Sequence, residues 1–130
     1  MDASDRFIDA LNRKDIAAVE ACVHPEFEMI VLQRPARGFR GREQELKNMR
    51  YMFETYPDLS VTLLRKARVG NEVWTETTAR GVDINMAAVV IWTIDDETDT
   101  LLGGRFYSEP VQGDAPGIDR FMQSIGRTQN

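Results

Sequence analysis

Histidine and cysteine are nearly absent from this sequence, and their scarcity restricts its chemistry. Cys22 is the only cysteine among 130 residues, which excludes an intrachain disulfide and a thiolate cluster for zinc. It lies in an apolar stretch with helical spacing, so we expect a buried, inert thiol. His24 is the only histidine, and no carboxylates stand at ligand spacing. The sequence therefore predicts no metal site, and it shows no cofactor motif.

Long apolar runs and basic clusters are also missing. No stretch approaches the roughly 20 apolar residues that a membrane-spanning helix needs. The first residues lack the basic and apolar regions of a signal peptide. The net charge is −5, and the lysines and arginines are scattered, which argues against a nucleic-acid surface. We expect a cytoplasmic protein that binds neither nucleic acid nor membranes.

The remaining composition is that of an ordinary folded domain. Apolar residues make up 42% of the chain and charged residues 28%. A chain of 130 residues suffices for one domain with a real core but is short for two, so we expect a single domain over residues 1–130. Residues 112–130 are predicted to be a C-terminal helical extension, because Ile118, Phe121, Met122 and Ile125 follow helical spacing.

Apolar periodicity predicts three helices before this extension. The first covers residues 3–13, with Asp2 or Ser4 as N-cap. A second, short helix is capped by Asp15 and ends at His24, because Pro25 restricts the residue before it. The longest covers residues 42–56 and stops at Pro57.

The strand pattern is equally regular. A first strand is expected over residues 27–32, followed by a loop over 33–41. After the long helix, strands are expected over residues 59–69, 73–80, 86–94 and 101–111, joined by hairpin turns. The order predicts an α+β fold in which a curved antiparallel sheet wraps around the long helix and leaves a conical cavity.

The last strand carries a row of polar groups. A two-residue period puts Arg105, Tyr107 and Glu109 on one face, and the opposite face takes Leu102, Gly104, Phe106 and Ser108. A cation, a phenol and a carboxylate side by side are costly to bury unless they pair or meet a ligand. This row is therefore predicted to form one wall of a site.

Five short segments, in this order and spacing, carry a family resemblance. They are Phe7 to Asp15, Gly38 to Glu43, Tyr56 to Leu59, Gly70 to Val73, and Arg105 to Val111. On these segments the chain resembles the SnoaL-like branch of the nuclear transport factor 2-like (NTF2-like) superfamily, which includes ketosteroid isomerase, scytalone dehydratase and limonene epoxide hydrolase. The resemblance implies the cone-shaped, cystatin-like α+β barrel.

The resemblance also implies roles for side chains. In these proteins the concave face receives the ligand, and several enzymes keep a catalytic acid or base on the last strand, where this chain has Glu109. Desolvation in an apolar cone would raise the proton affinity of Glu109, as a general acid or base requires. Arg105 and Tyr107 are its expected electrostatic partners, and Glu76 is a possible second carboxylate. The expected function is cofactor-independent acid–base chemistry of the isomerase, cyclase, dehydratase or hydrolase type.

The expected substrate is a small hydrophobic molecule. Its predicted contacts are Trp74, Arg80, Met49, Phe53 and Trp92. Core packing is the simpler interpretation of Met49, Phe53, Trp74 and Trp92, and an exposed or capping role is the simpler one for His24.

Two structural alternatives remain open at this stage. Arg105 could form an ion pair with Glu109 or Glu76, and the whole domain could be a non-catalytic binding or dimerisation module. The unbroken apolar run from Ala88 to Trp92 needs cover on both faces of the sheet. We therefore expect a homodimer through the convex face.

Overall fold

The computed structural model describes residues 1–111, and the predicted helical extension over 112–130 lies outside the described residues. The elements in chain order are α1 (Ala3–Arg13), α2 (Ile16–Cys22), β1 (Val23–Ile30), the 3₁₀ helix η1 (Pro35–Arg37), β2 (Phe39–Arg40), α3 (Arg42–Thr55), β3 (Ser60–Val69), β4 (Glu72–Gly81), β5 (Ile84–Asp95) and β6 (Thr100–Pro110). The expected α+β class is confirmed. None of the described helices is long and apolar enough to cross a membrane.

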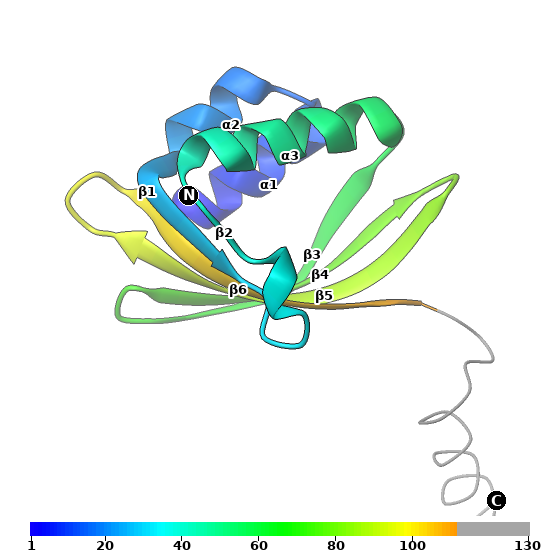
Figure 1. Ribbon diagram of the computed structural model, residues 1–130. Coiled ribbons are helices and arrows are strands. Elements are labelled where there is room, and N and C mark those ends of the chain that lie inside the picture. Colours follow the sequence, from blue (N-terminus) through cyan, green and yellow to red (C-terminus); the bar gives the residue numbers. More distant parts are fainter. Residues whose placement is uncertain (112–130) are drawn as a thin grey trace, which may run out of the picture.

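The six strands form one curved sheet in the order β2-β1-β6-β5-β4-β3. Neighbours are antiparallel except β1 and β6, which run parallel. All three α-helices lie on the same face of the sheet, which curves around them (Figure 1). We call this helix-covered face concave and the opposite face convex.

Helix α1 begins and ends where the sequence predicts. Asp2 accepts a hydrogen bond from the Asp5 amide, and the Asp5 side chain accepts one from the Asp2 amide, which completes a capping box. Lys14 ends the helix in the left-handed conformation, with φ of 55°. From there its ammonium donates to the backbone oxygen of Leu59, which ties α1 to the start of β3.

The second helix is shorter than the sequence predicts. Asp15 caps it as expected, but it ends at Cys22, and His24 and Pro25 belong to β1. The apolar spacing of Val19 and Val23 fits a helix, yet Val23 is already extended, with φ of −111° and ψ of 127°. β-branched Val23 and the restriction before Pro25 both favour the extended backbone, so the strand starts earlier.

The long helix and the meander agree with the predicted ranges to within two residues. Gly41 provides the N-cap position of α3 with φ of 95°, a conformation that glycine adopts readily. The expected loop over residues 33–41 contains η1 and the two-residue strand β2, which are too short to give a periodic signal.

Two bulges interrupt the alternation of side chains. Thr93 of β5 pairs with Gly103, but the next residue, Ile94, pairs with Leu101, so Leu102 is an extra residue in β6. A second register shift leaves Leu64 as an extra residue in β3. Each bulge reverses which residues of its strand face the helices.

Glycines at the β6 bulge allow close packing with two neighbours. A Cβ on Gly103 would stand 2.8 Å from the backbone oxygen of Glu28 in β1, and one on Gly104 would stand 3.1 Å from the Trp92 ring. The absence of side chains at Gly103 and Gly104 therefore lets β1 and the Trp92 ring approach β6 closely.

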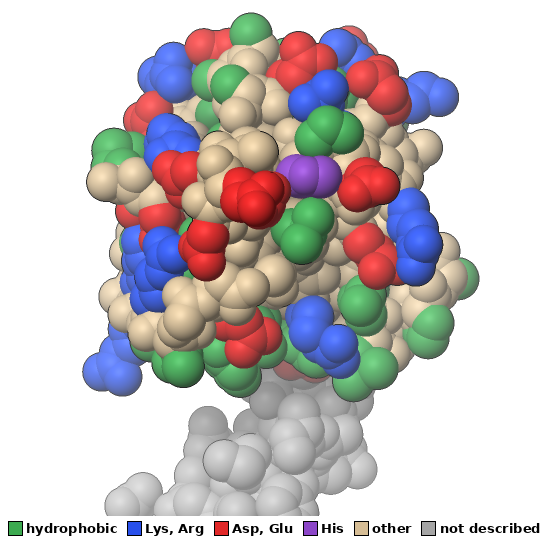
Figure 2. All heavy atoms as spheres, turned by 90° about the vertical axis from the view of Figure 1, so that its left-hand side faces the viewer, with side chains coloured by type: hydrophobic (Ala, Val, Ile, Leu, Met, Phe, Trp, Pro, Cys, Tyr) green, Lys and Arg blue, Asp and Glu red, His purple; other side chains and the backbone are tan. Residues whose placement is uncertain are grey.

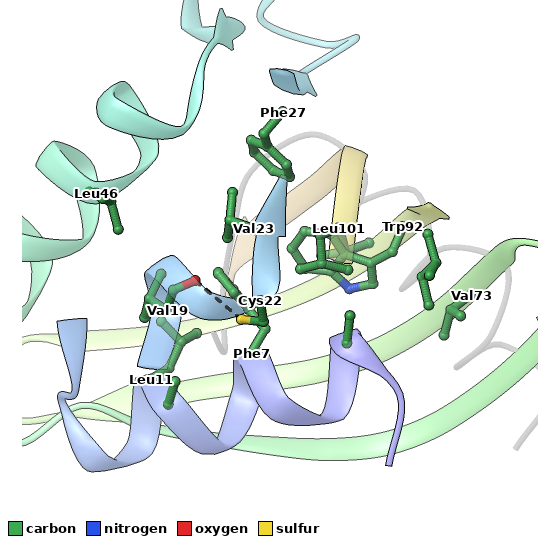
Figure 3. Close-up of a cluster of buried hydrophobic side chains, with 14 residues drawn as sticks. Phe7, Leu11, Val19, Cys22, Val23, Phe27, Leu46, Val73, Trp92 and Leu101 are labelled. Atoms are coloured by element: carbon green, nitrogen blue, oxygen red, sulfur yellow. Dashed lines mark hydrogen bonds between the residues drawn. The ribbon is translucent and has the colours of Figure 1, made fainter. Parts of the chain in front are cut away.

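The core fills the space between the helices and the concave face. Phe7 of α1 and Phe27 of β1 lie against Trp92 of β5, with ring centroids 5.1 and 6.4 Å apart (Figure 3). Leu46 of α3 and Leu101 of β6 are fully buried in the same cluster. Cys22 is also buried there, and desolvation raises the pKa of its thiol to about 11, as expected for an inert cysteine.

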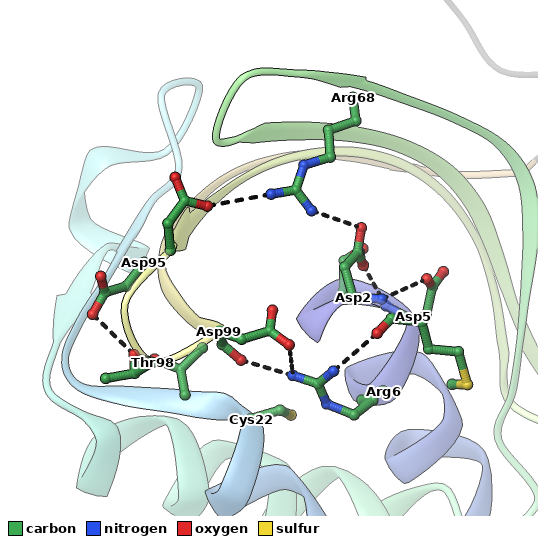
Figure 4. A network of polar contacts seen from close by, with 12 residues as sticks. Asp2, Asp5, Arg6, Cys22, Arg68, Asp95, Thr98 and Asp99 are labelled. Atoms are coloured by element: carbon green, nitrogen blue, oxygen red, sulfur yellow. Dashed lines mark hydrogen bonds and ion pairs between the residues drawn. The ribbon is translucent and has the colours of Figure 1, made fainter.

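Ion pairs fasten α1 to the rim of the sheet (Figure 4). Lys66 of β3 bridges Asp2 and Asp5 at 2.8 and 2.7 Å. Arg6 holds Asp99 in the β5–β6 turn at 2.9 Å. Burial alone would raise the pKa of Asp2, but Lys66 and the Ser4 hydroxyl outweigh it and hold that pKa well below its usual range.

Candidate functional site

The predicted row on the last strand faces away from the helices. Arg105, Tyr107 and Glu109 do share one face, as predicted, because they pair with Ile91, Val89 and Ala87 of β5. The alternate pairs, Gly104 with Trp92 and Phe106 with Val90, point into the core. The expectation that the row lines the concave face is therefore wrong.

The bulge at Leu102 is the physical reason. Leu101 is fully buried, and strict alternation from Leu101 would bring Arg105 and Glu109 to the concave face. The extra residue shifts the alternation by one, so Gly104 and Phe106 take the inward positions instead.

The predicted partners on β4 lie on the same convex face. Val73 and Thr75 are buried, whereas Trp74 is 46% exposed and Glu76 and Arg80 are exposed. Across the sheet Tyr107, Val89 and Glu76 form one row, because Val89 pairs with both of the others. The structure thus brings the predicted residues of β4 and β6 to one surface, outside the cone.

The alternative ion pair is not formed. Among the described residues, Arg105 makes no ion pair with Glu109 or with Glu76. Glu109 is exposed, so the desolvation that would adapt it to acid–base work is missing. A catalytic role for this row stays a prediction.

The other predicted substrate contacts do lie on the inner side. Met49 and Phe53 of α3 are half-buried and pack against the core cluster, to which Trp92, 4% exposed, belongs. The concave face around them is apolar or hydroxylic: it presents Val73, Thr75, Thr77, Ala88, Val90, Phe106 and Ser108. Thr75 satisfies its hydroxyl locally by donating to the backbone oxygen of Val90 at 3.2 Å.

One carboxyl group is buried on the inner side of α3, near the Cys22 thiol of α2. Glu45 is 2% exposed, and burial raises its pKa to about 7. Glu45 lies on the inner face of α3. The core-facing residues Leu46, Met49 and Phe53 stand one, four and eight positions after it, so all four side chains point within about a third of a turn of one another around the helix axis. A carboxyl group that titrates near neutrality can both donate and accept a proton.

Glu45 is not among the site residues predicted from the sequence, because an acidic residue in the first turn of a helix is already explained by its favourable interaction with the helix N-terminus. A signal was present in the spacing. Glu43 lies off the apolar stripe and is exposed, whereas Glu45 shares the phase of Leu46 and Met49 and is buried.

His24 has both ring nitrogens occupied. Its Nδ1 accepts a hydrogen bond from the Glu26 amide at 3.0 Å, and its Nε2 lies 3.5 Å from a carboxylate oxygen of Asp95. A base needs a free nitrogen facing its substrate. These contacts favour a structural role over proton transfer, although His24 lies in β1 and does not cap α2.

Two surface pockets stand out in the described part of the chain. One, of about 310 Å³, is formed by β1, the loop after it and β2, and is lined by Met29, Val31 and Phe39 among others. The other, of about 510 Å³, lies beside His24 and Arg42. Within residues 1–111, no three histidine, cysteine or acidic side chains gather as a metal site would require.

Solved structures with the same fold include proteins of several activities. A candidate ketosteroid isomerase from Kribbella flavida is 17% identical, with TM-score 0.72 and coverage of 91% of this chain and 83% of that chain. A candidate SnoaL-like polyketide cyclase from Shewanella denitrificans is 14% identical, with TM-score 0.71 and coverage of 94% and 95%. A limonene-epoxide-hydrolase-like (LEH-like) epoxide hydrolase from M. tuberculosis is 19% identical, with TM-score 0.68 and coverage of 82% and 80%. At these identities the likeness establishes the fold alone.

The sequence itself supplies the family. Among curated proteins, none matches the chain. A family model described as the SnoaL-like domain matches residues 4–98, from α1 to the β5–β6 turn. The chain belongs to the SnoaL-like family and has the NTF2-like fold.

Proposed function

We propose that the chain binds a small hydrophobic molecule on the concave face and performs acid–base chemistry on it without a cofactor, with Glu45 as the proton donor or acceptor. The observation that carries this proposal is the burial of Glu45 among apolar side chains on the inner face of α3. Burial raises its pKa to about 7, so both protonation states are populated at neutral pH.

The surroundings fit such a role. Met49, Phe53 and Phe106 are only partly buried, so they offer apolar surface to a ligand. Thr77 and Ser108 add hydroxyl groups at neighbouring positions of the concave face. The three similar structures are named for an isomerase, a cyclase and an epoxide hydrolase, which supports acid–base chemistry as the reaction class.

The test compares the two candidate carboxylates. Purified protein is assayed for ketosteroid isomerisation, epoxide hydrolysis and polyketide cyclisation, each with Glu45→Gln and Glu109→Gln. Loss of a general acid or base lowers turnover by about 10²–10⁴-fold. We expect that loss for Glu45→Gln and near-normal turnover for Glu109→Gln. The opposite result would move the chemistry to the convex face, and no turnover in any assay would favour the non-catalytic module.

A homodimer through the convex face is the partner that this surface supports. Its centre is apolar, with Trp74, Val89, Ile91 and Tyr107 on adjacent strands. Its charged side chains are balanced in sign: Arg65, Arg80, Arg105, Glu72, Glu76 and Glu109. None of these six forms an ion pair with another described residue. A patch with equal numbers of both charges around an apolar centre can complement a second copy of itself.

A further inference from the structure

The pocket of about 510 Å³ lies away from the concave face, where α2, the start of β1, the first residue of α3 and the β5–β6 turn meet. Figure 2 looks onto this side of the molecule, and His24 lies at its centre between acidic side chains. Ala21 and Val23 give the pocket an apolar wall, while Thr98 and Thr100 bring hydroxyl groups. Its volume is within the range of about 300–1,000 Å³ that is typical of ligand sites.

Arg42 supplies an unsatisfied donor at one wall. Its Nε is fully buried and has no hydrogen-bond partner in the part of the chain that the structure describes. The Arg42 guanidinium also forms no ion pair with a described residue, so an anionic group in the pocket would supply its missing countercharge. Arg42 is also the first residue of α3, whose N-cap Gly41 has no side chain to cap the helix, so the positive helix end adds to the attraction.

Glu20 supplies the opposite charge at another wall. It lines the same pocket from α2 and forms no ion pair with a described residue, Arg42 included. Asp95 adds a second carboxylate nearby through its contact with His24. The pocket lining therefore includes one arginine and one carboxylate that form no ion pair with each other.

We propose that this pocket binds a small zwitterion of the α-amino acid class, with the ligand carboxylate on Arg42 and the ligand ammonium group on Glu20. A purely anionic ligand would meet the Glu20 carboxylate, and a purely cationic one would leave the Arg42 guanidinium without a countercharge. Ala21 and Val23 fit a short apolar side chain on the ligand. Glu45 does not line this pocket, so binding here and the proposed chemistry at Glu45 can each fail alone.

Three probes of matched shape test the charge requirement. L-valine carries both charges, isovalerate carries only the carboxylate, and isobutylamine carries only the ammonium group. The full chain is titrated with each by calorimetry, and the Glu20 and Thr98 amide signals are followed by NMR. We expect L-valine to bind at least about tenfold more tightly than either analogue. No binding of L-valine up to about 10 mM, or equal binding of isovalerate, would overturn the proposal.

Variants test the two walls. Glu20→Gln and Arg42→Gln are each expected to weaken L-valine binding about tenfold or more. Glu20 is exposed, so its variant is expected to fold normally and keeps the test valid if Arg42→Gln does not fold. Glu43→Gln and Arg40→Gln change charges that do not line this pocket and serve as controls. Wild-type affinity in Glu20→Gln, or an equal loss in the control variants, would contradict the proposal.

Discussion

Glu45 illustrates how the position of one side chain on a helix determines its chemistry. Glu43 and Glu45 have the same side chain and stand two residues apart, but only Glu45 is buried. Because water stabilises the carboxylate more than an apolar interior does, burial raises the pKa of Glu45 from 4.5 to about 7. At neutral pH the ionised Glu45 side chain therefore lowers the stability of the folded state.

That cost predicts a pH dependence. In the folded state Glu45 keeps its proton up to about pH 7, whereas in the unfolded chain it loses it near 4.5. The free energy of unfolding should then fall between these values, by up to about 3 kcal/mol, and should stay low above them. Glu45→Gln removes this titration, so at pH 8 the variant should be more stable than the wild type by about 1–3 kcal/mol. Urea unfolding at pH 4, 6 and 8 measures both curves.

Glu43→Gln is the matched control, because Glu43 is exposed on the same helix turn. Its stability curve should follow that of the wild type. An identical pH profile for the wild type and Glu45→Gln would show that the interior carboxyl group does not titrate as described.

For single residues, the sequence predicts burial better than it predicts ion-pair partners. Spacing alone could have identified Glu45, since it lies in phase with Leu46 and Met49. Spacing could not reveal which carboxylates find partners. The ion pair that Arg105 could have formed with Glu109 or Glu76 is absent among the described residues. Lys66, by contrast, pairs with Asp2 and Asp5, which stand 64 and 61 positions before it in the sequence.

At the scale of elements, the β6 bulge decides which surface receives the polar row. Deletion of Leu102 would remove the residue that has no partner in β5 and would leave Arg105 and Glu109 on the convex face, so this variant should fold. Deletion of Gly104, which has a partner in β5, would instead turn Arg105 and Glu109 toward the core. Burial of these charges without partners would prevent stable folding. Circular dichroism and thermal unfolding distinguish the two variants. A Gly104 deletion as stable as the Leu102 deletion would contradict the assigned register.

The anchoring of α1 gives a second prediction at this scale. Asp2→Ala removes the helix cap and an ion-pair partner of Lys66, so it should lower stability by about 1–2 kcal/mol at pH 7. Since the pKa of Asp2 is depressed in the folded state, this contribution is present above its ordinary value of 3.8 and is lost as the pH falls below it. Asp9→Ala removes only a solvent-exposed pair with Arg13 and should cost much less than Asp2→Ala. Equal losses from both variants in urea unfolding would show that the cap contributes nothing special.

Elements were predictable from the sequence where they are long and regular. Residues 42–56 and the four meander strands have strong periodicity, and the structure follows them closely. The short strand β2 and the bulges depend on pairing with distant strands, which local pattern does not record. For that reason the sequence correctly placed Arg105, Tyr107 and Glu109 on one face of β6 but wrongly predicted that this face is the concave one.

At the scale of the whole molecule, the sheet has two faces with different expected partners. Helices cover the concave face, and the convex face presents Trp74 and Val89 in the described part of the chain. We expect a dimer at micromolar concentration by analytical ultracentrifugation. Trp74→Glu should shift it to monomer, because a buried carboxylate without a partner is costly at an apolar interface.

Val82→Glu provides the control for the dimer. Val82 is 87% exposed in the turn between β4 and β5, so this variant adds the same charge outside the convex patch. It should remain dimeric. A monomeric wild type, or equal dissociation of both variants, would show that the convex face is not the interface.

The central claim is that the ligand meets the concave face and the second copy meets the convex face. Alanine methyl NMR tests it most directly, because the adjacent residues Ala87 and Ala88 point to opposite faces, as do Ala67 and Ala79. On titration with 2-acetylnaphthalene, a small apolar ketone, the methyl signals of Ala88 and Ala79 should shift while those of Ala87 and Ala67 stay unchanged. Dilution of the protein should move the second pair only. Ligand shifts confined to Ala87 and Ala67, or absent from all four methyl groups, would contradict the account.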